Sequence, residues 1–132
     1  MTAEHLTGKP GASWIAIVRK NGSPEFAAAF APDVVLDASV LSGPFVGVSK
    51  IAAFFAATAG GMYDSLTFTH ETVSGPKTYL EWEGKAFGEQ VGGTTILTRN
   101  ESGQIRSIRL YHRPLDAVLM FAGELNRRFA SV

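Results

Sequence analysis

The chain has 132 residues, of which 45% are hydrophobic and 18% are charged, a balance typical of one globular domain rather than of a disordered segment. The formal net charge is zero, which argues against a general attraction to nucleic acid or to an anionic membrane. Because the chain has no cysteine, disulfides, thiolate catalysis and thiolate metal ligands are excluded. No apolar run approaches the roughly 20 residues that cross a bilayer. Residues 1–11 are polar and carry no signal-peptide core, so we expect a cytoplasmic protein that contacts no membrane.

The first third of the chain predicts two short helices and a strand. Apolar side chains recur at three- and four-residue spacing over residues 10–18, and an Asn-Gly pair at 21–22 ends that helix. A Ser-Pro-Glu sequence then supplies a capping hydroxyl, a proline suited to the first turn and an acidic group at the positive end of the dipole. We therefore expect a second, brief helix over 23–30, followed by a strand at 34–36.

The rest of the chain predicts one more helix, several strands and a closing helix. Residues 48–59 carry a helical apolar face and end at a Gly-Gly pair. Alternating apolar residues predict strands over 66–73, 79–87, 94–99 and 105–112, with a hairpin turn at 100–103. Pro114 opens the final helix, in which we expect Leu115, Leu119, Ala122 and Phe129 to face one way.

This order of elements predicts an α+β fold with an antiparallel sheet in a single domain, residues 1–132. Glycines at 84, 88 and 92–93 favour bulges and strong curvature in the strands. A curved sheet whose concave face is covered by helices encloses a cone-shaped pocket rather than a filled sandwich. We therefore expect such a pocket.

Three stretches of the chain carry a resemblance to a known family. They are Phe-Ala-Pro-Asp-Val-Val-Leu at 30–36, Gly47 followed by Ile-Ala-Ala-Phe-Phe at 51–55, and Asn-Glu-Ser-Gly-Gln-Ile at 100–105. Together they resemble the nuclear-transport-factor-2-like superfamily, in its SnoaL-like and ketosteroid-isomerase-like branch, over about residues 14–119. The resemblance implies a cystatin-like fold, which hosts many unrelated activities.

The resemblance also shows where the ketosteroid isomerase chemistry is missing. The position of the carboxylate base corresponds to Ala38, whereas Asp37 is its neighbour and points to the other face of the strand. The second acid corresponds to Thr95, and the tyrosine falls near Trp14. Steroid isomerisation by that mechanism is therefore not expected, unless a one-residue shift turns Asp37 inward as a catalytic carboxylate.

The same alignment predicts the walls of the pocket, which are largely apolar and suit a lipophilic small molecule. The residues expected there are Trp14, Ile51, Phe55, Leu80, Trp82, Thr95, Leu97, Ile108, Leu110 and His112. His112 is the candidate general acid or base; alternatively, it is a core histidine bonded to the backbone or to Tyr63. His70 lies inside or outside according to the strand register.

The opposite face of the sheet is expected to carry Glu81, Glu83, Arg109 and Arg113 among exposed aromatic side chains. One interpretation is a hydrated surface with cross-strand charge pairs. Because relatives of the resembled family commonly dimerise through this face, we predict a homodimer there. The histidines show no zinc-ligand spacing and the chain has no cofactor motif, so we expect neither a metal nor a cofactor.

Three functions are consistent with these features. The sequence favours a small-molecule-binding protein with an apolar pocket. The alternative is an acid–base enzyme, such as an isomerase, cyclase, dehydratase or hydrolase, acting on a lipophilic substrate. A structural module with a collapsed cavity is the third. A cavity lined by both His112 and Asp37 would favour the enzyme, and one lined by carbon atoms would favour binding.

Overall fold

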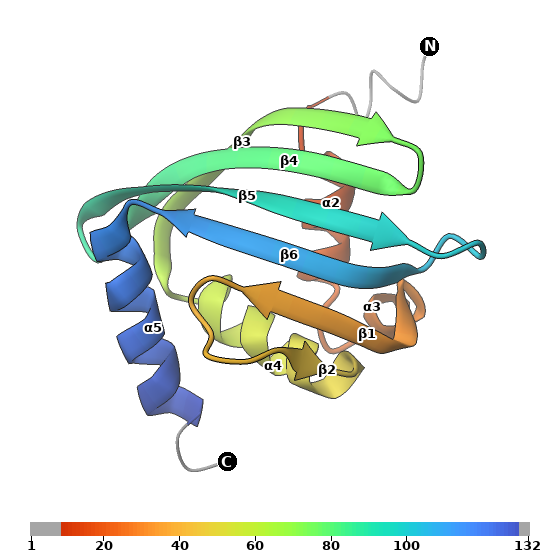
Figure 1. Ribbon diagram of the computed structural model, residues 1–132, viewed down its shortest axis with the longest axis horizontal. Helices are drawn as coiled ribbons and strands as arrows, with labels where there is room; N and C mark the ends of the chain where they lie inside the picture. The colour runs from red at the N-terminus through yellow and green to blue at the C-terminus, as the bar shows by residue number, and fades with distance from the viewer. Residues whose placement is uncertain (1–8, 130–132) are drawn as a thin grey trace.

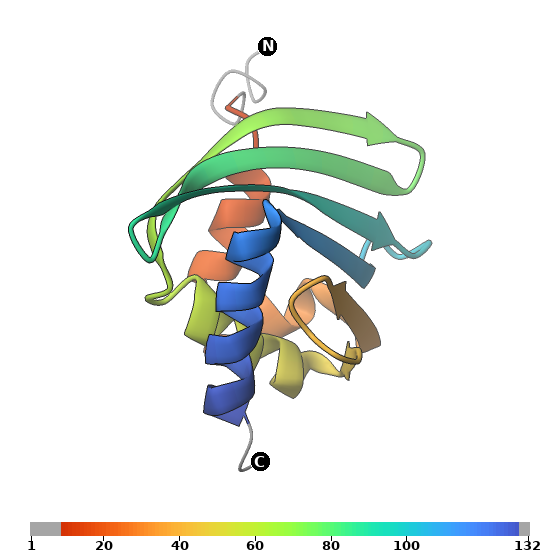
Figure 2. The same ribbon diagram turned by 60° about the vertical axis from the view of Figure 1, so that its left-hand side comes forward.

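A strongly bent six-stranded sheet forms one wall of the protein, and helices occupy its concave side (Figures 1 and 2). The computed structural model describes residues 9–129, so most of the polar N-terminal stretch considered above lies outside the described residues. The helices are α2 (Ala12–Arg19), α3 (Pro24–Ala28), α4 (Val48–Thr58) and α5 (Leu115–Phe129). The strands are β1 (Phe30–Ala38), β2 (Phe45–Val46), β3 (Tyr63–Ser74), β4 (Lys77–Ala86), β5 (Glu89–Arg99) and β6 (Ile105–Arg113).

The sheet has the order β2-β1-β6-β5-β4-β3 and is mostly antiparallel. The prediction of an α+β fold with an antiparallel sheet is confirmed, with one parallel pairing. Strand β1 pairs with β6 in parallel, with Leu36 opposite Ile108 and Ala38 opposite Leu110. The reason is topological: β1 is separated from the β3–β6 meander by α4, and it joins the free edge of the last strand, along which it runs in the same direction.

The start of β1 also differs from the sequence expectation, because Phe30 opens the strand instead of ending the helix before it. Pro32 and Asp33 therefore lie inside the strand. Proline has no N–H to give to a β-ladder. The pairing with β6 is irregular between Phe30 and Val35, and this irregularity accommodates the proline without breaking the strand.

Two glycines allow the sheet to bend around the hydrophobic core on its concave face. A Cβ at Gly93 would collide with the carbonyl of Tyr111 and the indole of Trp82, and one at Gly84 would collide with the carbonyl of Ser65. Bulges interrupt the β3–β4 pairing between Tyr63 and Ser65 and again between Phe68 and His70. The predicted curvature is therefore present, although β5 begins at Glu89 and absorbs most of the expected 88–93 bend.

Helix α5 turns inward a face that matches the sequence pattern only in part: Phe129 packs against Phe45, but Leu115 and Leu119 do not face the core. Ala117, Phe121 and Leu125 are buried, whereas Leu115 and Leu119 are 68% and 59% exposed. The helix carries apolar residues on both faces, so periodicity alone does not choose between them. Tertiary packing chooses, because the Phe121 ring fills the space beside Tyr63, Phe87 and His112, at centroid separations of 5.1, 5.3 and 4.6 Å.

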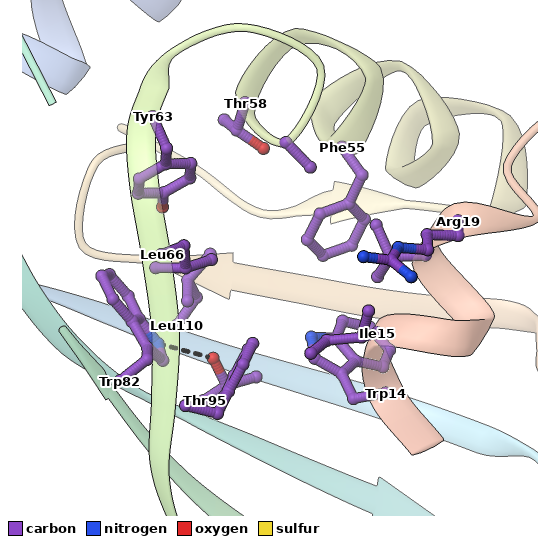
Figure 3. A pocket seen from close by; sticks show the side chains of 13 residues that line it. Trp14, Ile15, Arg19, Phe55, Thr58, Tyr63, Leu66, Trp82, Thr95 and Leu110 are labelled. Carbon is purple, nitrogen blue, oxygen red and sulfur yellow. Dashed lines mark hydrogen bonds between the residues drawn. The ribbon is translucent and has the colours of Figure 1, made fainter. Parts of the chain in front are cut away.

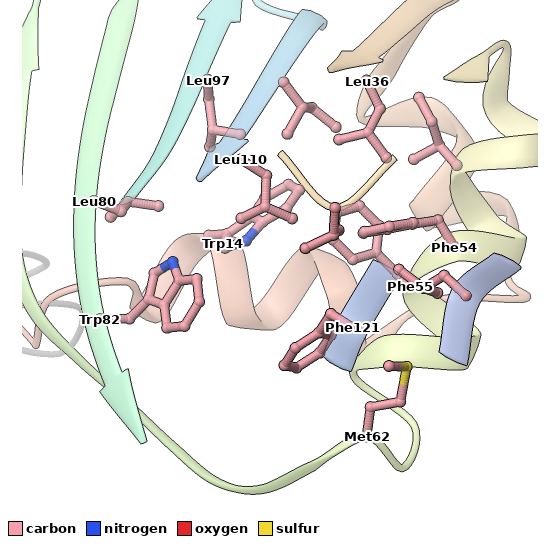
Figure 4. Packing of buried hydrophobic residues seen from close by; sticks show 14 of the residues in the cluster. Trp14, Leu36, Phe54, Phe55, Met62, Leu80, Trp82, Leu97, Leu110 and Phe121 are labelled. Atoms are coloured by element: carbon pink, nitrogen blue, oxygen red, sulfur yellow. The ribbon is translucent and has the colours of Figure 1, made fainter. Parts of the chain in front are cut away.

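The hydrophobic core occupies the space between the concave face and helices α2, α4 and α5 (Figure 4). Trp14 meets Phe30 and Phe55 edge to face, at 6.3 and 5.4 Å, and Phe54 packs against Phe55 at 5.2 Å. These aromatic contacts fill the part of the cone between α2, α4 and β1. In the described part of the chain, no helix is long and apolar enough to span a membrane.

We predict that Gly93→Ala destabilises the fold by about 2 kcal/mol or more, because the methyl group meets a backbone carbonyl on one side and a buried indole on the other. Gly123→Ala is the matched control. Gly123 lies on the exposed side of α5 with open space around it, so alanine there should stabilise by about 0.5–1 kcal/mol. Urea unfolding measures both, and an unchanged midpoint for Gly93→Ala would contradict this account of the bend.

Candidate functional site

A cavity of about 270 Å³, partly open to solvent, lies between helix α2, the end of α4 and the concave face of the sheet (Figure 3). This volume is near the lower limit of small-molecule pockets, which run from about 300 to 1,000 Å³. It therefore suits a molecule of one or two rings better than a steroid. The described residues that line it are Trp14, Ile15, Val18, Arg19, Phe55, Thr58, Ala59, Tyr63, Leu66, Phe68, Trp82, Thr95 and Leu110.

The structure brings five of the sequence-predicted binding residues together in this lining: Trp14, Phe55, Trp82, Thr95 and Leu110. Leu80, Leu97 and Ile108 also face the concave side, but they are at most 1% exposed and do not line the cavity. Ile51 is likewise fully buried in the core. Strand alternation assigns a side chain to a face of the sheet, whereas its depth below the helices depends on tertiary packing.

Sequence reasoning missed the rest of the lining, including Arg19, Leu66 and Phe68. Arg19 is the last residue of α2. A basic side chain is common at that position because it interacts favourably with the negative end of the helix dipole, so the sequence gives no sign of a role in binding. Phe68 lies directly opposite Trp82 in the β3–β4 register, so the alternation of β3 could have placed it on the concave face. Tyr63 was considered only as a partner of His112.

Two polar contacts inside the cavity wall involve threonines. The Trp82 Nε1–H donates to Thr95 Oγ1 at 3.0 Å, and both side chains are 2% exposed. Thr58 Oγ1 donates to the carbonyl of Phe54 at 3.0 Å. A hydroxyl that accepts one hydrogen bond still carries its own proton. Thr95, at the position that the resemblance gives to an acid, can therefore donate a hydrogen bond to a ligand, but its hydroxyl does not ionise near neutral pH and cannot serve as an acid.

His112 lies behind the cavity wall and is not part of the lining. Its Nε2 is 2.7 Å from the Tyr63 hydroxyl, and its ring is enclosed by Tyr63, Trp82 and Phe121. Its Nδ1 has no hydrogen-bond partner among the described residues. Burial lowers the pKa of His112 to about 4 and raises that of Tyr63 above its usual value. The geometry is that of a neutral core histidine bonded to Tyr63, which reaches a ligand only through that tyrosine.

The two other titratable candidates lie on the outer face of the sheet. Asp37 is exposed and lies opposite Arg109 in the parallel β1–β6 register. Because β1 pairs without a break from Val35 to Ala38, the one-residue shift that would turn Asp37 inward is absent. Asp37 is therefore not a pocket residue, which corrects the catalytic assignment considered above.

His70 is turned outward by a bulge in β3. The register moves by one residue between Phe68 and His70, so His70 lies opposite Glu81 on the outer face and not beside Phe68 on the inner one. Its Nδ1 is 3.3 Å from Glu81 Oε1, and its side chain is 75% exposed. The expectation that His70 lines the pocket is thus corrected. Within residues 9–129, no three histidine or acidic side chains lie close enough together to hold a metal ion.

We predict that the burial of His112 makes stability fall on acidification. The unfolded imidazole takes up a proton as the pH drops through 6.5, whereas the folded one stays neutral down to about 4. The unfolded state binds more protons in this window, so the free energy of unfolding should fall by up to about 3 kcal/mol between those pH values and level off below them. Urea unfolding at several pH values measures the slope.

His112→Leu should flatten this dependence and the control His70→Gln, at an exposed site, should retain it. A slope unchanged in His112→Leu would assign the effect to other groups. Nuclear magnetic resonance of the wild-type imidazole protons provides a second measurement, because the His112 ring should show no titration between pH 7 and 5.

No protein-family model matches the chain, and no curated protein matches it in sequence. Solved structures do match. A steroid delta-isomerase from Pseudomonas aeruginosa superposes with a TM-score of 0.78 at 16% identity, covering 99% of this chain and 94% of its own. An uncharacterised protein with a cystatin-like fold from Silicibacter pomeroyi gives 0.74 at 22% identity, covering 84% and 78%.

A third match is a protein from Catenulispora acidiphila with a ketosteroid isomerase-like fold, whose structure contains trimethylamine. It gives a TM-score of 0.60 at 20% identity and covers 83% of this chain and 91% of its own. At these identities the likeness establishes architecture and leaves chemistry to the residues. The chain has the cystatin-like α+β fold that ketosteroid isomerase-like and nuclear-transport-factor-2-like proteins share.

Proposed function

We propose that this protein binds a small, largely apolar molecule in the cavity between α2, α4 and the concave face of the sheet. The observation that carries the proposal is the cavity itself, of about 270 Å³, with walls that are mainly carbon and include both tryptophans of the chain. Indole rings offer a large apolar area to a ligand at a small cost in conformational entropy. Proteins of similar fold include one solved with trimethylamine, which supports a small-molecule site on this architecture.

Binding is favoured over acid–base catalysis by the chemistry of the lining. Proton abstraction next to a carbonyl needs a base within hydrogen-bond reach of the substrate. Among the described lining residues there is no carboxylate and no histidine. The alternative of an acid–base enzyme rests on the Tyr63–His112 pair, since the Tyr63 hydroxyl could donate to a substrate oxygen. Conversion of a bound ligand that is lost in Tyr63→Phe would favour this alternative.

We predict that naphthalene-2-carboxamide, a neutral two-ring probe, binds the wild-type protein and that Val18→Trp weakens it at least tenfold. Val18 lies on the cavity wall and is only partly buried, so an indole there fills the space without disturbing the core. Val46→Trp is the matched control, because Val46 is 54% exposed on β2 and away from the lining. Isothermal titration calorimetry measures both affinities. Equal affinity in both variants would place the probe elsewhere, and absence of wild-type binding would contradict an apolar site.

We also propose that the chain forms a homodimer through the outer face of the sheet. Tyr79 and Tyr111 are 39% and 45% exposed there, and Ile96 lies between Tyr79 and Arg109 in the register. Charges of both signs accompany them, so the same patch on two copies can pair acidic with basic groups about a two-fold axis. The cytoplasmic location expected from the sequence stays a prediction.

Light scattering after size exclusion should give twice the chain mass for the wild type at micromolar concentration. Tyr111→Glu should give a monomer, because it replaces an exposed aromatic ring of the patch with a hydrated carboxylate that loses its water when a second copy covers it. Leu119→Glu, which also replaces an exposed apolar residue but lies on α5, should remain dimeric. A monomeric wild type contradicts the proposal. Dissociation by Leu119→Glu but not by Tyr111→Glu would move the interface to α5.

A further inference from the structure

Arg19 is the one charged side chain in the described lining of the cavity. It ends helix α2, and Figure 3 shows its guanidinium reaching from that helix toward the space beside Phe55 and Ile15. The residue as a whole is exposed, so the group lies at the solvent side of the cavity and not in its interior. A cation at the open end of an otherwise carbon-lined cavity creates a site with one apolar part and one charged part.

Among the described residues, the carboxylates of Glu71 and Glu25 form no ion pair with Arg19. Glu71 Oε1 accepts the Gly11 backbone N–H at 2.8 Å, at the opposite end of the helix. The pKa of Glu25 is lowered mainly by a hydrogen bond from its own backbone N–H. Among the ion pairs of the described residues, none involves Arg19. The guanidinium donors on the cavity side are therefore available to a ligand.

We infer that the ligand is a small lipophilic acid, with its ring or chain in the cavity and its carboxylate at Arg19. The inference rests on the proposed binding function and names the chemical class of the ligand. A planar guanidinium presents paired N–H donors that match the two oxygens of a carboxylate. At the open end, the anion keeps part of its hydration, so the large cost of burying a charge is avoided. An amine would meet a like charge at the same place.

Naphthalene-2-carboxylate and naphthalene-2-carboxamide test this inference, because the two have nearly the same shape and differ in charge. We expect the wild type to bind the carboxylate about five times more tightly in low salt, a modest preference because an exposed pair is partly screened. In Arg19→Gln the ratio of the two affinities should fall to about one, because both probes then meet a neutral side chain at the open end of the cavity. Arg19→Lys should retain part of the preference. Calorimetry at low and at high salt measures each affinity.

Lys20→Gln is the matched control, since Lys20 carries the same charge on the next residue but does not line the cavity. It should keep the wild-type preference. Equal wild-type affinities for the two probes would overturn the acidic ligand and leave the apolar site standing. A preference that survives in Arg19→Gln, or is lost equally in Lys20→Gln, would also overturn it, because the charge at Arg19 would not be its source. Failure of both probes to bind would contradict the apolar site itself.

Discussion

The contact between the Trp82 ring and Gly93 holds the architecture of the site together. Gly93 lies directly opposite Trp82 in the β4–β5 register, and the missing side chain at Gly93 leaves the space that the indole fills. The indole N–H then reaches Thr95 on the same neighbouring strand. The ring also packs against Tyr63 and His112, at 5.8 and 5.0 Å. One large side chain thus connects the bend of the sheet, the wall of the cavity and the buried polar pair.

The cavity wall contains few polar groups, and most of them already form hydrogen bonds within the protein. Buried donors and acceptors are costly when unpaired, so the indole and the hydroxyls of Tyr63 and Thr58 bond to protein groups. Behind this wall, His112 Nδ1 has no hydrogen-bond partner among the described residues. The groups that remain for a ligand are the hydroxyl proton of Thr95 and the guanidinium of Arg19.

The cavity of this protein therefore has different polar side chains from those of the ketosteroid isomerases that the sequence resembles. Architecture is shared with a steroid delta-isomerase over almost the whole chain. The positions that the sequence resemblance assigns to the ketosteroid isomerase acids nevertheless hold Ala38 and Thr95 here. The curved sheet and its helices fix where a cavity lies. The side chains on its walls decide whether that cavity moves protons or only holds a ligand.

Local sequence determined much of this protein. Apolar periodicity, caps and glycines predicted the helices α2 and α4 and the meander β3–β6, because these depend on interactions between residues near one another in the chain. The family resemblance, together with strand alternation, placed Trp82, Thr95 and Leu110 on the concave face, where β4, β5 and β6 run in regular register through these residues. The fold and the inner wall of the cavity could therefore be predicted.

Only the tertiary structure decided the rest, for reasons that local patterns do not contain. A one-residue bulge turned His70 outward, and an unbroken parallel pairing kept Asp37 on the outer face. Helix α5 has two apolar faces, and the space beside His112 selected the one that carries Phe121. Arg19 became a cavity residue because of the direction in which α2 crosses the sheet. Strand register, the packing of a helix on the sheet and the burial depth of a side chain all depend on contacts between distant parts of the chain. These contacts form only when the whole domain has folded.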